Sequence, residues 1–72
     1  VRVREKIAFA QIPTVQAAIA SAERELNGNG RVVVRYSGTE ALARVMVEAE
    51  SKEQIDRIAG SIVGELQTAL GT

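Results

Sequence analysis

The sequence contains no cysteine and no histidine. Without cysteine the chain can form neither a disulfide framework nor a thiolate metal site, so a reducing, cytoplasmic location is expected rather than an extracellular one. Without histidine, and with Asp56 as the single aspartate, neither a metal cluster nor an imidazole base can be assembled. The sequence therefore predicts no metal site and no catalytic residue within these residues.

Aromatic residues, net charge and long apolar runs are also scarce. The chain has one Phe and one Tyr, and nine basic side chains balance nine acidic ones. A zero net charge provides no long-range field to attract nucleic acid or an anionic membrane, so any anion site must be local. No stretch has the apolar length of a signal peptide or a membrane span. A sheet that binds single-stranded nucleic acid is the alternative from another functional class, but it would need exposed aromatics and a basic groove.

The length of 72 residues permits one domain, and a chain this short buries only about 60% of the surface of its unfolded form. An alternating pattern is already running at Val1, and there is no initiator Met. We therefore expect residues 1–72 to be one domain of a longer protein.

Two segments show the spacing of amphipathic helices. After an alternating, extended opening stretch up to Phe9, expected to be an edge strand, the spacing changes to three and four residues at Ile12. This predicts a helix with Pro13 in its first turn that ends at the Asn-Gly-Asn-Gly sequence of residues 27–30. Residues 51–54 have the form of a capping box and predict a second helix up to residue 70.

Between the helices, two β-rich runs at 31–36 and 42–49 flank a short connection and predict an antiparallel hairpin. We place Tyr36 opposite Ala41, which makes Arg35 and Arg44 diagonal neighbours on the polar face. The element order predicts an α+β fold, in which two helices pack on one face of a small, curved antiparallel sheet. The apolar face of the hairpin, expected to be its core face, consists of Val32, Val34, Tyr36, Ala43, Val45 and Val47.

The hairpin is the one segment with the residue types of a binding site. It brings together two guanidinium groups, two hydroxyls and a glycine: Arg35, Ser37, Gly38, Thr39 and Arg44. Guanidinium forks match phosphate oxygens in pairs, hydroxyls donate single bonds, and glycine lets backbone N–H groups approach an anion. The hydroxyls have no adjacent general base, so they are expected to bind and not to react.

A structural role of the same residues is the alternative. Ser-Gly-Thr is a common turn composition, and strand arginines are often solvated charges or partners of carboxylates such as Glu40 and Glu48. The carboxylate of Glu40 would repel a phosphate unless it pairs with Arg44 or points away from the site.

At this hairpin the sequence resembles the carboxy-terminal domain of the phosphohexomutase superfamily. The motif Arg-x-Ser-Gly-Thr-Glu at 35–40, followed by Arg-Val-Met-Val-Glu at 44–48, is similar to the phosphoglucosamine mutase branch, and the likeness covers most of the chain. It implies a phosphoglucomutase C-terminal domain-like, TBP-like fold. The resemblance also implies that the five hairpin residues named above hold the substrate phosphate that is not being transferred, and that Glu40 either contacts substrate or supports the loop.

The resemblance further implies a reaction. In such enzymes a phosphoserine and a bisphosphate intermediate interconvert glucosamine 6-phosphate and glucosamine 1-phosphate, a step of amino-sugar metabolism and cell-wall precursor biosynthesis. The phosphoserine and a Mg²⁺ ion belong to other domains of the same chain, so these residues alone are expected to be inactive. Ala41 stands where the family usually has proline, which predicts a looser loop. The same domain of a phosphomannomutase or phosphoglucomutase is the nearest alternative.

Overall fold

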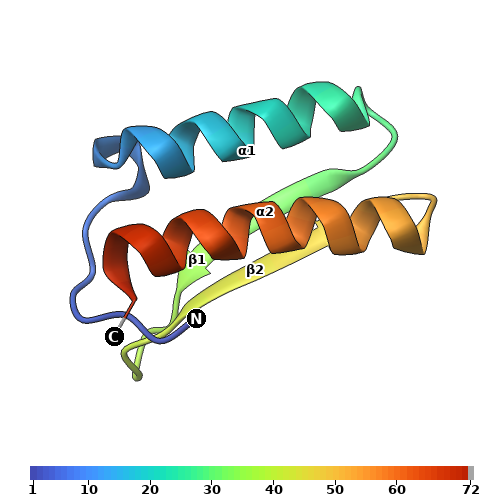
Figure 1. Cartoon of the computed structure of the whole chain (residues 1–72). Coiled ribbons are helices and arrows are strands. Elements are labelled where there is room, and N and C mark those ends of the chain that lie inside the picture. Colours follow the sequence, from blue (N-terminus) through green and yellow to red (C-terminus); the bar gives the residue numbers. More distant parts are fainter. Residues whose placement is uncertain (72) are drawn as a thin grey trace.

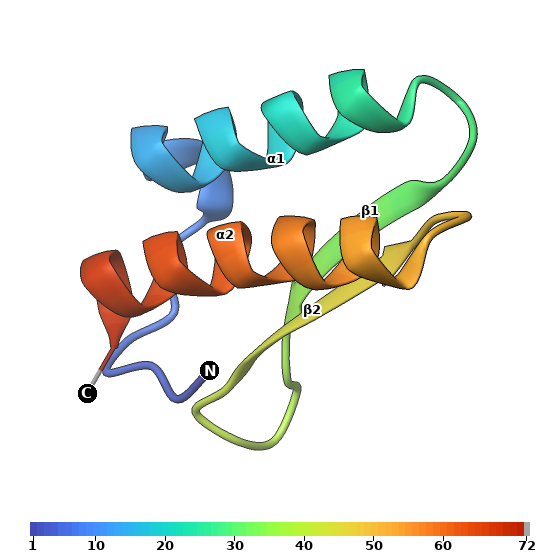
Figure 2. The same ribbon diagram turned by 45° about the vertical axis from the view of Figure 1, so that its right-hand side comes forward.

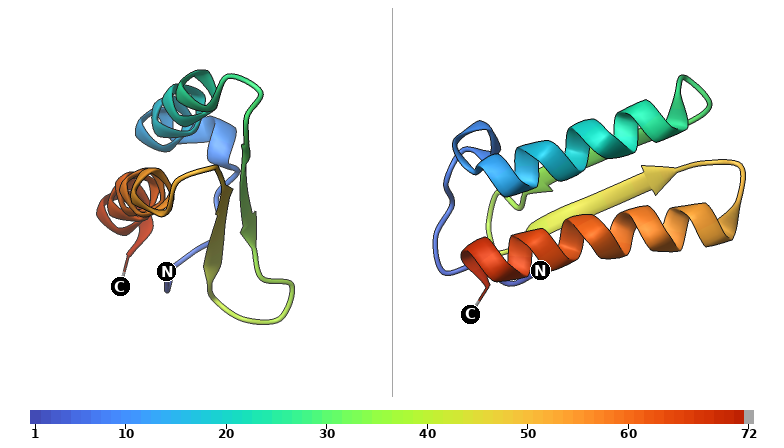
Figure 3. Two further views of the ribbon diagram at one scale, coloured as in Figure 1. Left: turned by 90° about the vertical axis from the view of Figure 1, so that its right-hand side faces the viewer. Right: turned by 45° about the horizontal axis from the view of Figure 1, so that its top comes forward.

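The computed structural model describes residues 1–71 and shows two helices lying on one face of a two-stranded antiparallel sheet (Figure 1). In chain order the elements are η1 (Phe9–Gln11), α1 (Pro13–Leu26), β1 (Arg31–Tyr36), β2 (Ala43–Glu48) and α2 (Lys52–Leu70). The end-on view in Figure 3 separates a layer of two helices from a layer of two strands. The predicted α+β arrangement is therefore confirmed. No helix within residues 1–71 combines the length and the apolar composition needed to cross a bilayer.

Helix α1 begins and ends where the sequence predicts. Pro13 occupies the first helical position, where its missing N–H costs no hydrogen bond. Asn27 adopts the left-handed conformation (φ 45°, ψ 47°) and its N–H bonds to the carbonyl of Glu23, which ends the helix. The three-four spacing turns Val15, fully buried, and Leu26, 3% exposed, toward the sheet and α2.

The hairpin has the predicted faces but a different register. Tyr36 pairs with Ala43, not with Ala41, and the connecting loop spans 37–42. A shift of two residues leaves every side chain on the same face, so the hydrophobic pattern does not distinguish the two registers. The predicted register is therefore wrong, whereas the predicted core face packs against the helices. The second strand is also shorter at each end than the predicted 42–49.

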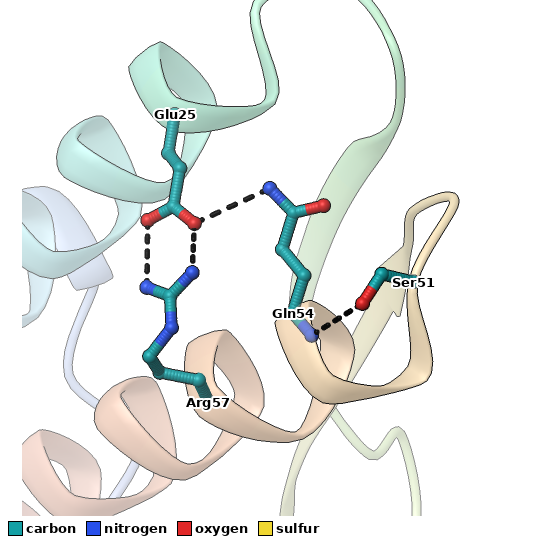
Figure 4. Close-up of polar contacts among 4 residues, drawn as sticks. All are labelled: Glu25, Ser51, Gln54 and Arg57. Carbon is teal, nitrogen blue, oxygen red and sulfur yellow. Dashed lines mark hydrogen bonds and ion pairs between the residues drawn. The ribbon is translucent and has the colours of Figure 1, made fainter.

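Helix α2 has one half of the predicted capping box. The hydroxyl of Ser51 accepts a 3.2 Å hydrogen bond from the Gln54 N–H, as predicted. The side chain of Gln54 does not return to Ser51, because it donates instead to the Glu25 carboxylate of α1 at 3.2 Å (Figure 4). Glu25 also accepts two bonds from the Arg57 guanidinium, and one of them measures 2.8 Å. This cluster joins the end of α1 to the start of α2.

The two glycines of α2 are not packing contacts. A Cβ atom placed on Gly60 or Gly64 would meet nothing within 4 Å. These glycines therefore act only through their low helix propensity, which costs about 1 kcal/mol each.

The opening segment is extended only at its start. Arg2 forms an isolated bridge with Leu42, and Val3 forms one with Gly71. The segment thus runs beside both the β1–β2 loop and the end of α2, as Figure 2 shows. The predicted edge strand is reduced to these bridges. Phe9 instead begins the turn η1, and its ring stacks on the ring of Tyr36, with centroids 4.4 Å apart.

The core lies between the helix layer and the sheet. Its least exposed large side chains come from the helices, and the strands and the opening segment close its edge with Ala43 and Val3. The opposite face of the sheet has exposed side chains, including Met46, which is 45% exposed. The buried hydrophobic residues are Val3, Ile12, Val15, Ala22, Leu26, Ala43, Ile58, Ile62, Leu66 and Leu70.

Candidate functional site

Arg35 and Arg44 lie directly opposite each other on the sheet face turned away from the helices. Strand alternation places them there, because Val34 and Val45 point into the core on the other face. The observed register makes them a direct cross-strand pair instead of the predicted diagonal pair. Like charges at directly opposite positions destabilise a sheet by roughly 0.2–1 kcal/mol, so the arrangement costs stability.

Neither guanidinium of this pair is neutralised by a carboxylate of the described chain. The ion pairs within residues 1–71 join Arg31 to Glu48 at 3.1 Å and Arg57 to Glu25. Glu48, one of the carboxylates considered as a partner, is thus engaged at the far end of the sheet. Arg35 and Arg44 remain two exposed cations side by side.

Next to this pair, Ser37 organises the loop through its hydroxyl oxygen. That oxygen accepts the N–H groups of Thr39 at 3.3 Å and Glu40 at 3.2 Å, and the side chain is buried. Acceptance of N–H groups from two and three residues later by a hydroxyl oxygen is typical of serine in turns. The hydroxyl hydrogen remains a donor. At the base of the loop, the Ser37 N–H bonds to the Leu42 carbonyl at 2.8 Å.

The predicted site residues meet in one open groove of about 790 Å³ along the exposed sheet face. Glu40 does not line this groove, and within the described residues it forms no ion pair. Of the two arrangements considered for Glu40, pairing with Arg44 is therefore not seen, and its carboxylate lies outside the groove. The predicted residues that line the groove are Arg35, Ser37, Gly38, Thr39 and Arg44.

A second groove of about 480 Å³ lies between α1 and α2, and its one arginine, Arg57, is paired with Glu25. The Arg57 guanidinium, together with Gln54, lowers the pKa of Glu25 from 4.5 to about 2. The same groove contains the carboxylate of Glu65, so it does not favour an anion. In the part of the chain that the structure describes, no group of three or more His, Cys, Asp or Glu side chains could hold a metal ion.

Sequence reasoning missed two contacts of the opening segment, one with the loop and one with the end of β1. The Lys6 ammonium donates to the Ser37 carbonyl at 2.6 Å. The Tyr36 hydroxyl donates to the Ile7 carbonyl at 2.5 Å and accepts from the Ile7 N–H at 3.1 Å. Both contacts join residues far apart in the chain, and no local pattern signals them.

Comparison with known proteins agrees with the resemblance seen in the sequence. Residues 1–65 match the family described as phosphoglucomutase/phosphomannomutase, C-terminal domain. The chain is 51% identical to the phosphoglucosamine mutase of Koribacter versatilis over 71 residues, which are 99% of this chain and 15% of that protein. It is 46% identical to the phosphoglucosamine mutase of Solidesulfovibrio magneticus over 70 residues, 97% of this chain and 16% of that protein. The phosphoglucosamine mutase of Corynebacterium efficiens is 49% identical over 69 residues, 96% of this chain and 15% of the relative. The chain therefore spans about one sixth of the length of these relatives.

Proposed function

The chain belongs to the phosphoglucomutase/phosphomannomutase C-terminal domain family, and from this premise we propose that it binds the substrate phosphate in a phosphoglucosamine mutase. The observation that supports this role best is the pair Arg35 and Arg44, opposed on one face without a carboxylate partner in the described residues. A phosphate monoester carries about −1.5 to −2 charges near neutral pH, which two guanidinium groups balance. An arrangement that is unfavourable without ligand thus becomes favourable with one.

The loop supplies the remaining contacts in this proposal. Gly38 and Thr39 line the groove beside the arginines, and a Cβ on Gly38 would meet nothing within 4 Å. Backbone N–H and hydroxyl donors can therefore reach an anion there without a side chain in the way. Charge-assisted bonds from both arginines would fix the orientation of the phosphate, as bidentate guanidinium contacts do.

The proposed reaction is the interconversion of glucosamine 6-phosphate and glucosamine 1-phosphate through a phosphoserine enzyme and a bisphosphate intermediate. The described residues offer no nucleophile with a base and no metal cluster, so we assign the phosphoserine and Mg²⁺ to other domains of the longer protein. Binding energy at the phosphate that does not react would hold the other end of the sugar in line for transfer. We propose that this domain closes over the substrate, which would keep water from the phosphoenzyme.

Titration of the 15N-labelled 72-residue chain with inorganic phosphate tests the site directly. The amide signals of Ser37, Gly38 and Thr39 should shift before those of either helix. Gly38→Ala adds a Cβ in open space, so it should leave the fold intact and still weaken phosphate binding, because the Cβ shields the N–H. Uniform shifts over the whole chain would contradict a site at the hairpin.

In the longer protein, Arg35→Ala should lower kcat/KM far more than Arg31→Ala. Arg31 is the matched control, because it lies on the same strand and face but is paired with Glu48. The two positions are about 13 Å apart along the strand, at roughly 3.3 Å per residue. Equal losses in the two variants would mean that the hairpin end is not the phosphate site.

A further inference from the structure

Lys6 holds the candidate phosphate loop from outside the groove. Its ammonium group donates a 2.6 Å hydrogen bond to the carbonyl oxygen of Ser37, in a partly buried contact. A bond with a charged donor is roughly twice as strong as one between neutral groups. Lys6 is not among the residues that line the groove, whereas Ser37 and Gly38 are. The lysine therefore acts on the loop and not directly on a ligand in the groove.

The carbonyl that Lys6 holds belongs to the same peptide group as the N–H of Gly38. Residues 1–71 contain no cis peptide bond, and in a trans peptide the C=O and the N–H point in opposite directions. Because Lys6 holds the carbonyl on its own side, the Gly38 N–H is directed away from Lys6, and Gly38 is one of the residues that line the groove. Without the hydrogen bond from Lys6, the peptide group before glycine could rotate at little energetic cost, because glycine has few backbone restrictions.

The first half of the loop, residues 37–40, also contains one unpaired backbone donor, the N–H of Gly38. The Ser37 N–H donates to the Leu42 carbonyl, and the N–H groups of Thr39 and Glu40 donate to the Ser37 hydroxyl oxygen. The Gly38 N–H has no acceptor among the described residues. An unpaired donor on a residue that lines the same groove as the two arginines is suited to receive an anion.

The chain next to Lys6 is itself fixed to the end of β1. Both backbone polar groups of Ile7 bond to the Tyr36 hydroxyl, and the ring of Phe9 stacks on the ring of Tyr36. At the other side, the Val3 N–H donates to the Ala41 carbonyl at 2.9 Å. The opening segment thus forms hydrogen bonds near both ends of the loop, at Tyr36 and at Ala41. These bonds fix the backbone on either side of Lys6.

We infer that Lys6 is a positioning residue for phosphate binding, because it fixes the Ser37–Gly38 peptide with the Gly38 N–H directed into the groove. The ammonium also polarises this peptide group, which strengthens the N–H as a donor. The inference rests on the proposed function, since it assigns Lys6 to the same phosphate site.

The test measures steady-state kinetics with glucosamine 6-phosphate in the longer protein that contains these residues. Lys6→Met keeps most of the side-chain length and removes the donor. It should raise KM about fivefold, the effect of losing one hydrogen bond of ordinary net strength, with a smaller change in kcat. Lys6→Arg keeps a charged donor and should restore most of the affinity. Lys52→Met is the matched control, because it removes the same charge at the start of α2, at the other end of the sheet, and should leave KM unchanged.

Two comparisons separate the possible outcomes. If Lys6 acted only through its charge, the effect of Lys6→Met would disappear at high ionic strength, whereas loss of a positioned donor persists. An effect that disappears, or a KM equal to that of Lys52→Met, would overturn the inference. Arg35→Ala is measured in parallel: if it also leaves kcat/KM unchanged, the proposed function fails, and if only Lys6→Met has no effect, the inference alone fails.

Discussion

The opposed guanidinium groups of Arg35 and Arg44 should make the protein less stable without phosphate and more stable with it. Replacing Arg44 by Gln removes one of two like charges at directly opposite strand positions. Two unit charges about 6 Å apart repel each other by roughly 0.7 kcal/mol in water, within the ~0.2–1 kcal/mol typical of like-charged cross-strand pairs. We therefore expect Arg44→Gln to raise the free energy of unfolding by about 0.5 kcal/mol in phosphate-free buffer.

Arg31→Gln is the matched control, because it makes the same substitution on the same sheet face. Arg31 pairs with Glu48, and the two side chains are 64% and 55% exposed. An ion pair this exposed contributes about 0–1 kcal/mol, so its loss should leave stability unchanged or lower it slightly. Only Arg44→Gln should therefore raise the free energy of unfolding.

Urea unfolding of the 72-residue chain at low ionic strength measures both effects. With a slope of about 1 kcal/mol per molar urea, Arg44→Gln should move the midpoint up by about 0.5 M. Near 1 M salt, where the Debye length is about 3 Å, this gain should largely disappear.

Phosphate should reverse the order of the two proteins. At a phosphate concentration of 100 times its Kd, the unchanged protein gains about 2.7 kcal/mol, whereas a variant that binds tenfold more weakly gains about 1.4 kcal/mol. A tenfold loss is the least expected from removing a hydrogen bond to a charged group, worth about 1.5–3 kcal/mol. If Arg44→Gln lowers the phosphate-free midpoint as much as Arg31→Gln does, the guanidinium pair is not strained and the reasoning is wrong.

Three further predictions concern stability. Gly60→Ala and Gly64→Ala should each raise the free energy of unfolding by about 1 kcal/mol in urea titrations. The added methyl group meets open space, and alanine favours the helix, so a loss of stability would contradict this expectation. Gly30→Ala should lower the free energy of unfolding by roughly 1–3 kcal/mol, because its Cβ would lie 2.1 Å from the backbone carbonyl oxygen of Glu48, the last residue of β2. An unchanged urea midpoint would show that the backbone shifts at little energetic cost. The Glu25 carboxyl should titrate near pH 2 by NMR, and Arg57→Gln should raise its pKa toward the ordinary 4.5, with Gln54 still lowering it. Because the pKa is lowered in the folded state, the contribution of Glu25 to stability is present above pH 4.5 and lost as the pH falls toward 2.

The sequence was sufficient to predict the helices and the faces of the strands, because both depend on local periodicity. The three-four spacing from Ile12 and the left-handed tendency of Asn27 define α1 within the chain itself. The alternation in β1 and β2 likewise assigns each side chain to a face. These are the features that do not depend on which distant residue lies nearby.

The register, the cap of α2 and the opening segment depend on contacts between distant residues. A shift of the pairing by two residues changes no face, so the two registers differ in contacts outside the pattern, such as the loop bonds to the Ser37 hydroxyl and the bond from the Val3 N–H to the Ala41 carbonyl. The side chain of Gln54 had a local partner in Ser51, but it bonds to Glu25 of α1 instead. The same holds for Lys6, whose contact with the loop cannot be read from spacing.

The hydrophobic core explains why the chain can tolerate a repulsive pair at its hairpin. Leu66 and Ile62 of α2 are fully buried, and truncating such a side chain to alanine costs about 2–5 kcal/mol. The repulsion between Arg35 and Arg44 costs at most about 1 kcal/mol, because both guanidinium groups face water on the uncovered side of the sheet. A small domain can therefore carry this local cost as long as the opposite face of the same strands stays packed. Moving the two cations to the core face would add the desolvation of unpaired charges, which costs several kcal/mol for each ion. The fold can therefore place two adjacent arginines on the exposed face of the sheet but not on its core face.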